Sequence, residues 1–150
     1  MFGGAQLSKV TAVGKTNDES VTSSTTLQDD DHLFFTGAPN TLYVVDFYLR
    51  AEFHASGQIK IAINAPSANF VSLNAAMIAN GVVTAQGTAN ALATAVPLTI
   101  NTATAGMVQA HVGILIGATG GQVVLQWAQE TSDATPTTVK AGSYLIANQI

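Results

Sequence analysis

A two-residue alternation of apolar and polar side chains constrains the fold of this chain more than any other feature. Between residues 41 and 54 every odd position from 43 onward is apolar, whereas the even positions include Asp46, Arg50, Glu52 and His54. Successive side chains of a β-strand point to opposite faces, so this segment predicts a strand with one face in a core and one face in water. An α-helix would distribute the same residues around its whole circumference.

The same alternation returns at residues 59–63, 108–116 and 122–127. Ser56-Gly57 separates the strand at 41–54 from the one at 59–63, and a Gly-rich turn at 118–121 separates the other two. We therefore predict two long β-hairpins, because a short turn between two alternating runs is the usual sequence signal for one. Weaker strands are predicted at residues 21–27, 33–36, 70–73, 82–86 and 93–100, and a final strand at 138–146.

Residues 70–87 allow two interpretations. Residues 74–79 could form one helical turn closed by Asn80-Gly81, but strand or loop is the predicted state. No long amphipathic helix is predicted elsewhere. Residues 1–18 carry little apolar patterning and are expected to form an N-terminal arm. Residues 19–150 are expected to form one all-β domain, an antiparallel β-sandwich of jelly-roll-like type, because roughly eight to ten short strands fit that architecture.

Charge is scarce in this chain. Only 14 of the 150 residues are Asp, Glu, Lys or Arg, which is 9%, whereas about 25% is usual in soluble domains. No charged residue occurs from position 61 through position 129. A lone subunit with so few charges tends to self-associate, so we expect subunit contacts to cover part of the surface. A monomer with a neutral Thr, Asn, Gln and Ser surface remains the alternative.

The composition argues against several classes of function. The net charge is −4 and the five basic residues are scattered, which disfavours nucleic-acid binding. The chain has no cysteine, so disulfides, zinc–thiolate sites and cysteine nucleophiles are excluded. The start of the chain does not read as a signal peptide, and the most apolar stretch, at 112–118, is shorter than the ~20 residues that a spanning helix needs. We expect a soluble, non-secretory protein without a membrane partner.

One dense polar cluster occurs, Asp29-Asp30-Asp31-His32. Carboxylates of this kind can bind a hard cation such as Ca²⁺, but the spacing of a calcium loop is missing. We predict a solvated turn, since Asp side chains readily bond to nearby backbone, and leave a cation or a partner contact as alternatives. The Gly-rich segment 117–121 lacks a following Lys and is predicted to be a turn between strands rather than a phosphate loop.

No residue pattern predicts catalysis. No serine lies in a G-x-S-x-G elbow, and Asp46 and Glu52 share a strand face but lie six positions apart. His111 is predicted to be a half-exposed strand residue, and Trp127 a core residue, with carbohydrate stacking beside Tyr144 and Gln126 as the alternative. The sequence thus predicts no catalytic, cofactor-binding or metal site.

Two segments resemble a known group of proteins. Residues 121–145, GQVVLQWAQETSDATPTTVKAGSYL, resemble the C-terminal part of tailed-phage virion proteins, in which a pattern running from LQWAQ to AGSYL closes the domain. Residues 21–33, VTSSTTLQDDDHL, resemble the lead-in of the same group. The resemblance covers most of the chain from about residue 15, and it implies a structural role with no catalytic residues. Such domains occur in capsid decoration proteins and in tail fibres.

The resemblance favours one role over two others. A chain of 150 residues with its own Met and a short lead-in is expected to be a capsid decoration (cement) protein. It would form a homotrimer, bind the major capsid protein on the capsid surface of the virion, and be made in the host cytoplasm. The alternative is a tail-fibre or tail-tip domain that binds a host glycan through an exposed Tyr48, Tyr144 or Trp127. An enzyme, such as a glycan depolymerase, is disfavoured by the scarcity of acidic residues.

Overall fold

The computed structural model describes residues 9–99 and 105–150, and its regular elements in these ranges are all β-strands. Within the described ranges there is no helix that could span a membrane. The twelve strands are β1 (Val10–Gly14), β2 (Glu19–Val21), β3 (Gln28–Gly37), β4 (Leu42–Glu52), β5 (Ile59–Asn64), β6 (Ala68–Ala79), β7 (Val82–Ala89), β8 (Val96–Leu98), β9 (Ala105–Ile116), β10 (Gly121–Ala128), β11 (Thr137–Val139) and β12 (Tyr144–Gln149).

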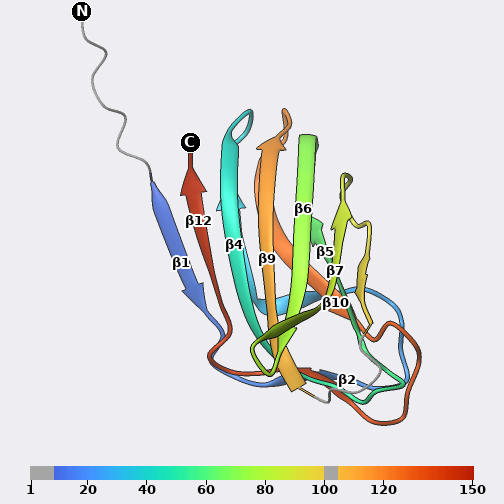
Figure 1. Ribbon diagram of the computed structural model, residues 1–150. Helices are drawn as coiled ribbons and strands as arrows, with labels where there is room; N and C mark the ends of the chain where they lie inside the picture. Colours follow the sequence, from blue (N-terminus) through green and yellow to red (C-terminus); the bar gives the residue numbers. More distant parts are fainter. Residues whose placement is uncertain (1–8, 100–104) are drawn as a thin grey trace, which may run out of the picture.

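The strands form two antiparallel sheets packed face to face (Figure 1). The larger sheet has the order β1-β12-β4-β9-β6-β7, and the short strands β2 and β11 extend it beside β4. The smaller sheet has the order β3-β10-β5-β8. In Figure 1 the strands β1, β12, β4, β9 and β6 lie side by side in front, while β10 and β5 lie behind them.

The pairing of the strands identifies the topology. β1 pairs with β12, β3 with β10, β4 with β9, and β5 with β8, all antiparallel. With β2, β11 and the β6–β7 pair set aside, the first strand therefore pairs with the last, the second with the second-last, and so on inward. That is one long hairpin rolled into two four-stranded sheets, which is a jelly roll. The predicted all-β, jelly-roll-like sandwich is confirmed.

Both hairpins predicted from the sequence are wrong. β4 lies in the larger sheet and β5 in the smaller one, and the same is true of β9 and β10. The turns at 53–58 and 117–120 are corners at which the chain crosses from one sheet to the other. Alternation shows which side chains of a strand face the core, but both sheets face the same core. Two consecutive alternating strands are therefore equally compatible with a hairpin and with a crossing.

The true hairpin joins β6 to β7, in the segment that the sequence left ambiguous. Asn80 and Gly81 both have positive φ, 52° and 76°, as a type I′ turn requires. The alternative of a helical turn at 74–79 is wrong, because these residues pair with β7 and β9. This hairpin is inserted between β5 and β8 and widens the larger sheet beyond β9.

Other boundaries also differ from those predicted. β2 ends at Val21, so most of the predicted strand at 21–27 is not a strand, and the segment 138–146 divides between β11 and β12. β8 covers residues 96–98 of the predicted 93–100, whose last residue lies outside the described ranges. The larger sheet begins at Val10, inside the segment 1–18 expected to be an arm, because β1 pairs with the C-terminal β12. Residues 1–8 lie outside the described ranges.

The core lies between the inner faces of the two sheets. Trp127 of β10 is fully buried in it, as predicted. Burial of each large apolar side chain contributes about 1.5–3 kcal/mol, so these residues carry most of the stability of the sandwich. The largest fully buried side chains are Trp127, Phe47, Leu33, Leu49, Ile59, Ile61, Ile63, Leu73, Met77, Leu98, Ile114 and Ile116.

The turn that closes the β6–β7 hairpin gives a test of this fold. A Cβ added at Gly81 would meet nothing within 4 Å, but it would be attached to a left-handed backbone. Gly81→Ala should therefore lower the free energy of unfolding by about 1–2 kcal/mol, measured by urea titration. Gly14→Ala is the matched control, because a Cβ there also meets nothing within 4 Å and the backbone is not left-handed. Equal effects of the two substitutions would contradict the assigned turn.

Candidate functional site

The acidic cluster at 29–32 lies in β3, so the prediction of a solvated turn is wrong. Phe34 of β3 pairs with Val124, and Asp29 pairs with Gln126, so the residues between them form a bulge. Asp30 lies in this bulge and is buried. Its Oδ1 accepts hydrogen bonds from the backbone N–H groups of His32 and Leu33, at 2.9 Å each. The local bonding that the sequence suggested is present, but it stabilises a bulge inside the sandwich.

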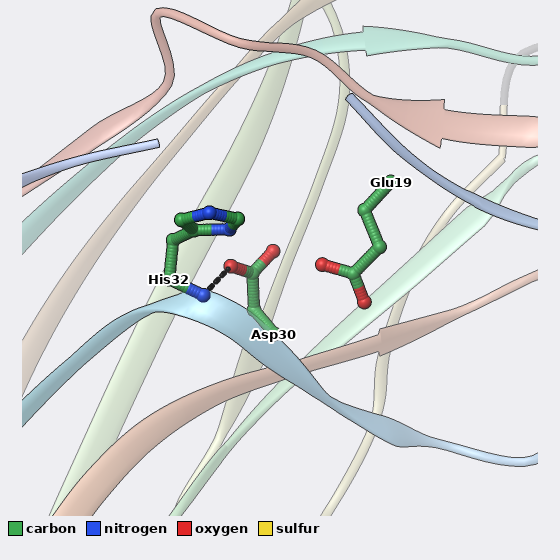
Figure 2. A group of neighbouring side chains, drawn as sticks. All are labelled: Glu19, Asp30 and His32. Atoms are coloured by element: carbon green, nitrogen blue, oxygen red, sulfur yellow. Dashed lines mark hydrogen bonds between the residues drawn. The ribbon is translucent and has the colours of Figure 1, made fainter. Parts of the chain in front are cut away.

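Three side chains near this bulge resemble the ligand set of a cation. Glu19, Asp30 and His32 each bring one possible ligand atom within 4.8 Å of the others (Figure 2). However, the ammonium group of Lys15 lies among them. Its Nζ is 2.6 Å from Glu19 Oε2, 2.9 and 3.0 Å from the two carboxylate oxygens of Asp30, and 3.5 Å from His32 Nδ1. The ammonium group of Lys15 therefore occupies the position that a cation would take between the Glu19 and Asp30 carboxylates.

The Asp30 carboxylate joins three parts of the chain. The side chains of Lys15 and Asp30 are both 0% exposed, and Trp127 donates its Nε1–H to Asp30 Oδ2 at 3.0 Å. Lys15 directly follows β1, while Asp30 and Trp127 belong to β3 and β10. Within the described residues Asp30 accepts five hydrogen bonds, two of them from Lys15, so its buried charge is compensated. This arrangement indicates a structural centre rather than a metal site.

Removal of the ammonium group tests this interpretation. Lys15→Met should lower the free energy of unfolding by about 3–5 kcal/mol, because it leaves a buried carboxylate without its counter-charge. Glu19→Gln is the control, since the Glu19 side chain is partly exposed and its loss should cost less. Denaturant titration measures both effects. Millimolar Ca²⁺ should leave the wild-type Tm unchanged, whereas a rise in Tm with Ca²⁺ would point to a metal site instead.

A groove of about 570 Å³ crosses the outer face of the larger sheet. The strand register fixes two rows of side chains there, each perpendicular to the strands. One row contains Asp46 (β4), His111 (β9), Asn74 (β6) and Thr88 (β7). The second row contains Tyr144 (β12), Tyr48 (β4), Gln109 (β9), Ala76 (β6) and Gln86 (β7).

Two contacts order the groove. The rings of Tyr48 and Tyr144 stack with centroids 4.8 Å apart and an angle of 22° between their planes. His111 Nδ1 lies 2.7 Å from Asp46 Oδ1. His111 is exposed on the strand, as predicted, and Tyr144 is exposed as well. Trp127 is buried, so the alternative that it stacks on a carbohydrate is wrong.

A cluster of Ser56, His54 and Asp133 lies at the surface near the corner between β4 and β5. Nδ1 of His54 contacts both Ser56 Oγ, at 2.6 Å, and Asp133 Oδ2, at 3.4 Å. In a Ser–His–Asp triad one imidazole nitrogen faces the serine and the other faces the aspartate. Here the Ser56 hydroxyl bonds directly to Asp133, and this bond, with the Thr135 backbone N–H, lowers the pKa of the Asp133 carboxyl. This geometry indicates that the cluster holds the corner at 53–58 against the loop at 129–136. It does not indicate that Ser56 is an activated nucleophile.

Charged residues gather at one end of the sandwich. Twelve of the 14 lie in residues 15–31, 50–60 and 130–140, which strand pairing and ion pairs bring together at the end that has the corner at 53–58 and the loop at 129–136. We call this end the charged end. Its charged residues are connected by ion pairs such as Lys140 with Asp18, at 2.9 Å, and Lys140 with Glu52, at 3.4 Å. The two remaining residues are Asp46, in the groove, and Lys9, which precedes β1. In Figure 1 the charged end, with β2, is the lower end of the molecule.

The opposite end is formed by the loops 37–41, 65–67, 90–95 and 117–120, none of which contains a charged residue; we call it the uncharged end. Backbone hydrogen bonds join the loops 37–41, 65–67 and 117–120, from Asn40 N–H to the Gly117 carbonyl and from Gly117 N–H to the Ser67 carbonyl. A Cβ at Gly120 would lie 2.7 Å from the Gly37 carbonyl oxygen, so the loops are packed closely together.

Exposed apolar side chains lie next to the uncharged end, on the same outer face as the groove. Leu42 and Phe70 are both paired with Leu115, and Ile150 donates its backbone N–H to the Leu42 carbonyl at 3.0 Å. Leu42 is 37% exposed, Phe70 53% and Ile150 65%. We call these four residues the apolar patch. No sequence signal reveals it, because Leu42 and Phe70 become neighbours only through β9.

Comparison with known proteins adds little. No family model matches this sequence, and no curated protein matches it. Among solved structures, two chains described as the structure of infectious bursal disease virus, Gt strain and Gx strain, align with 95% of this chain at 10% identity. Their TM-scores are 0.26 and 0.24, and this chain spans 37% and 36% of their lengths. So loose a superposition carries no functional weight.

Proposed function

We propose that this chain is a structural protein of a virion, a capsid decoration protein that assembles as a homotrimer and binds the major capsid protein at the capsid surface. The observation that carries the proposal is the separation of charge within the molecule. Twelve of 14 charged residues lie at one end, and an apolar patch of Leu42, Phe70, Leu115 and Ile150 lies beside the other.

The physical reason is the cost of removing charge from water. A buried charge without a partner is expensive, so contact surfaces favour regions that carry none. The cores of protein interfaces are accordingly depleted of charged residues and enriched in aromatic ones. The apolar patch meets both conditions, since Phe70 is exposed there and the neighbouring loops are uncharged. We assign the patch to contact between copies of this chain.

The uncharged loops themselves are assigned to the capsid. Weak contacts from each of three subunits become strong together, because attachment of one subunit holds the others close to their sites. The charged end then faces water and keeps the assembly soluble. The resemblance of residues 121–145 to tailed-phage virion proteins supports a structural role in a virion, and the proposed route is synthesis in the host cytoplasm followed by addition to the particle. Neither nucleic acid nor membrane is a proposed partner.

Substitution in the apolar patch tests the proposed self-assembly. The double variant Leu42→Asp, Phe70→Asp should sediment as a monomer in analytical ultracentrifugation, whereas the wild type should sediment as a trimer. Both side chains are exposed, so the far-ultraviolet circular dichroism should not change. Val82→Asp is the matched control, because Val82 is 61% exposed but lies at the tip of the β6–β7 hairpin, away from the patch.

The same proteins should be mixed with capsids that lack this protein and pelleted. Wild type and Val82→Asp should pellet with the capsids, and the double variant should not. A wild type that sediments as one subunit at all concentrations, or that attaches to free tails and not to capsids, would contradict the proposal.

A tail-fibre or tail-tip domain is the second candidate. It is favoured by one observation, the stacked and partly exposed pair Tyr48 and Tyr144 beside the amides of Asn74 and Gln109. This candidate predicts attachment to tails in the experiment above. A hydrolase is not proposed, because Asp46 is the one carboxylate that lines the groove, whereas glycoside hydrolysis commonly uses two.

A further inference from the structure

The groove on the outer face of the larger sheet has the chemistry of a binding site. Its lining comes from four neighbouring strands, β4, β9, β6 and β7, so a rigid scaffold holds each side chain in position. We propose that this groove binds a neutral oligosaccharide. The inference does not depend on whether the protein decorates a capsid or belongs to a tail, because the groove and the apolar patch use different residues of the face.

The hydrogen-bonding groups of the groove match those of a sugar. Asn74, Gln86 and Gln109 each present an amide that both donates and accepts, and Thr88 adds a hydroxyl. Sugar hydroxyls also donate and accept, so every such group can find a complement. The lining contains no Lys or Arg, which disfavours an anionic ligand. Its one carboxylate, Asp46, is already in contact with His111.

The tyrosine stack supplies the apolar part of the site. Tyr48 lies in the groove, and Tyr144 continues the same row onto β12 with its ring exposed. Rigid aromatic side chains give a large contact area at little entropic cost, and their faces suit the apolar C–H surfaces of sugar rings. Ala76 lies between Gln109 and Gln86 in the same row, and its small side chain leaves space for a ligand in the groove.

The length of the rows indicates a chain of sugars rather than a single ring. The second row runs over the five strands β12, β4, β9, β6 and β7. With neighbouring strands about 4.8 Å apart, it extends for roughly 19 Å. A peptide is a poorer occupant, because the backbone of the inner strands is already paired on both sides and cannot accept an added strand.

The direct test is nuclear magnetic resonance of the ¹⁵N-labelled full chain. The probes are neutral oligomers of glucose, galactose, mannose and N-acetylglucosamine, with an oligomer of galacturonic acid as the charged comparison. At least one neutral oligomer should shift the amide signals of Asp46, Tyr48, Asn74 and Gln109 in a saturable way. The galacturonic acid oligomer should bind more weakly, because the lining offers its carboxylates neither Lys nor Arg, and His111 is already in contact with Asp46.

Variants then locate the site. Asn74→Ala and Gln109→Ala should each weaken binding by about three- to tenfold, which is the usual effect of one lost hydrogen bond. Tyr48→Ala should weaken it by roughly tenfold. Asn148→Ala is the matched control, because Asn148 is an amide on the same face, in β12, but outside the groove. It should bind as the wild type does.

Three results would overturn the inference. The first is that no neutral oligomer shifts these amides at millimolar concentration. The second is that the shifts lie elsewhere, or that Asn148→Ala weakens binding as much as Asn74→Ala does. The third is that the groove amides shift only when the wild-type protein is concentrated or mixed with capsids, which would assign the groove to a protein partner. The sedimentation of the apolar-patch variant is unaffected by any of these outcomes, so failure here leaves the proposed function standing.

Discussion

Antiparallel pairing of β4 with β9 is the contact on which the other surface features depend. It joins eleven residue pairs, from Leu42–Leu115 to Glu52–Ala105, at the centre of the larger sheet. In this register Asp46 lies beside His111, Tyr48 beside Gln109, and Leu42 beside Leu115. A slip of one residue would turn the polar side chains of one strand toward the core, so burial of the alternate residues fixes the register. The groove and the apolar patch are thus consequences of core packing.

The rolled topology also explains how so few charges are distributed. The charged segments at 15–31, 50–60 and 130–140 are far apart in sequence, yet the corner at 53–58, the loop at 129–136 and the pair β2–β11 bring them to one end. The chain between positions 61 and 129 carries no charge and supplies much of the outer face and most of the opposite end. The Lys15–Asp30 pair is internal, and it connects the segment after β1 to β3 and, through Trp127, to β10. At the charged end, an ion pair and a hydrogen bond thus connect strands of both sheets.

Local signals predicted local features well. Alternation identified the inner and outer faces of β4 and β9, the core position of Trp127 and the exposure of His111. The partners of each strand could not be predicted this way, because pairing joins segments that can lie more than a hundred residues apart, as β1 and β12 do. Both predicted hairpins were wrong for that reason. The burial of Asp30 could not be predicted, because it depends on the contact with Lys15 and no sequence spacing links the two residues. The two rows of the groove could not be predicted either, because they follow from the register of five paired strands. Asn80-Gly81 was the exception, a local hairpin signal that was present in the sequence but was considered only as the end of the alternative helical turn.

We propose that neighbouring subunits and the capsid cover the uncharged end and leave the charged end in water. Hydrogen–deuterium exchange of the wild-type protein, compared between dilute and concentrated solutions and again on capsids, measures this directly. Amides of 37–42, 65–67 and 117–120 should exchange more slowly on assembly, whereas those of 54–58 and 130–136 should exchange at an unchanged rate. Slower exchange at 54–58 and 130–136, with the other loops unaffected, would contradict this arrangement.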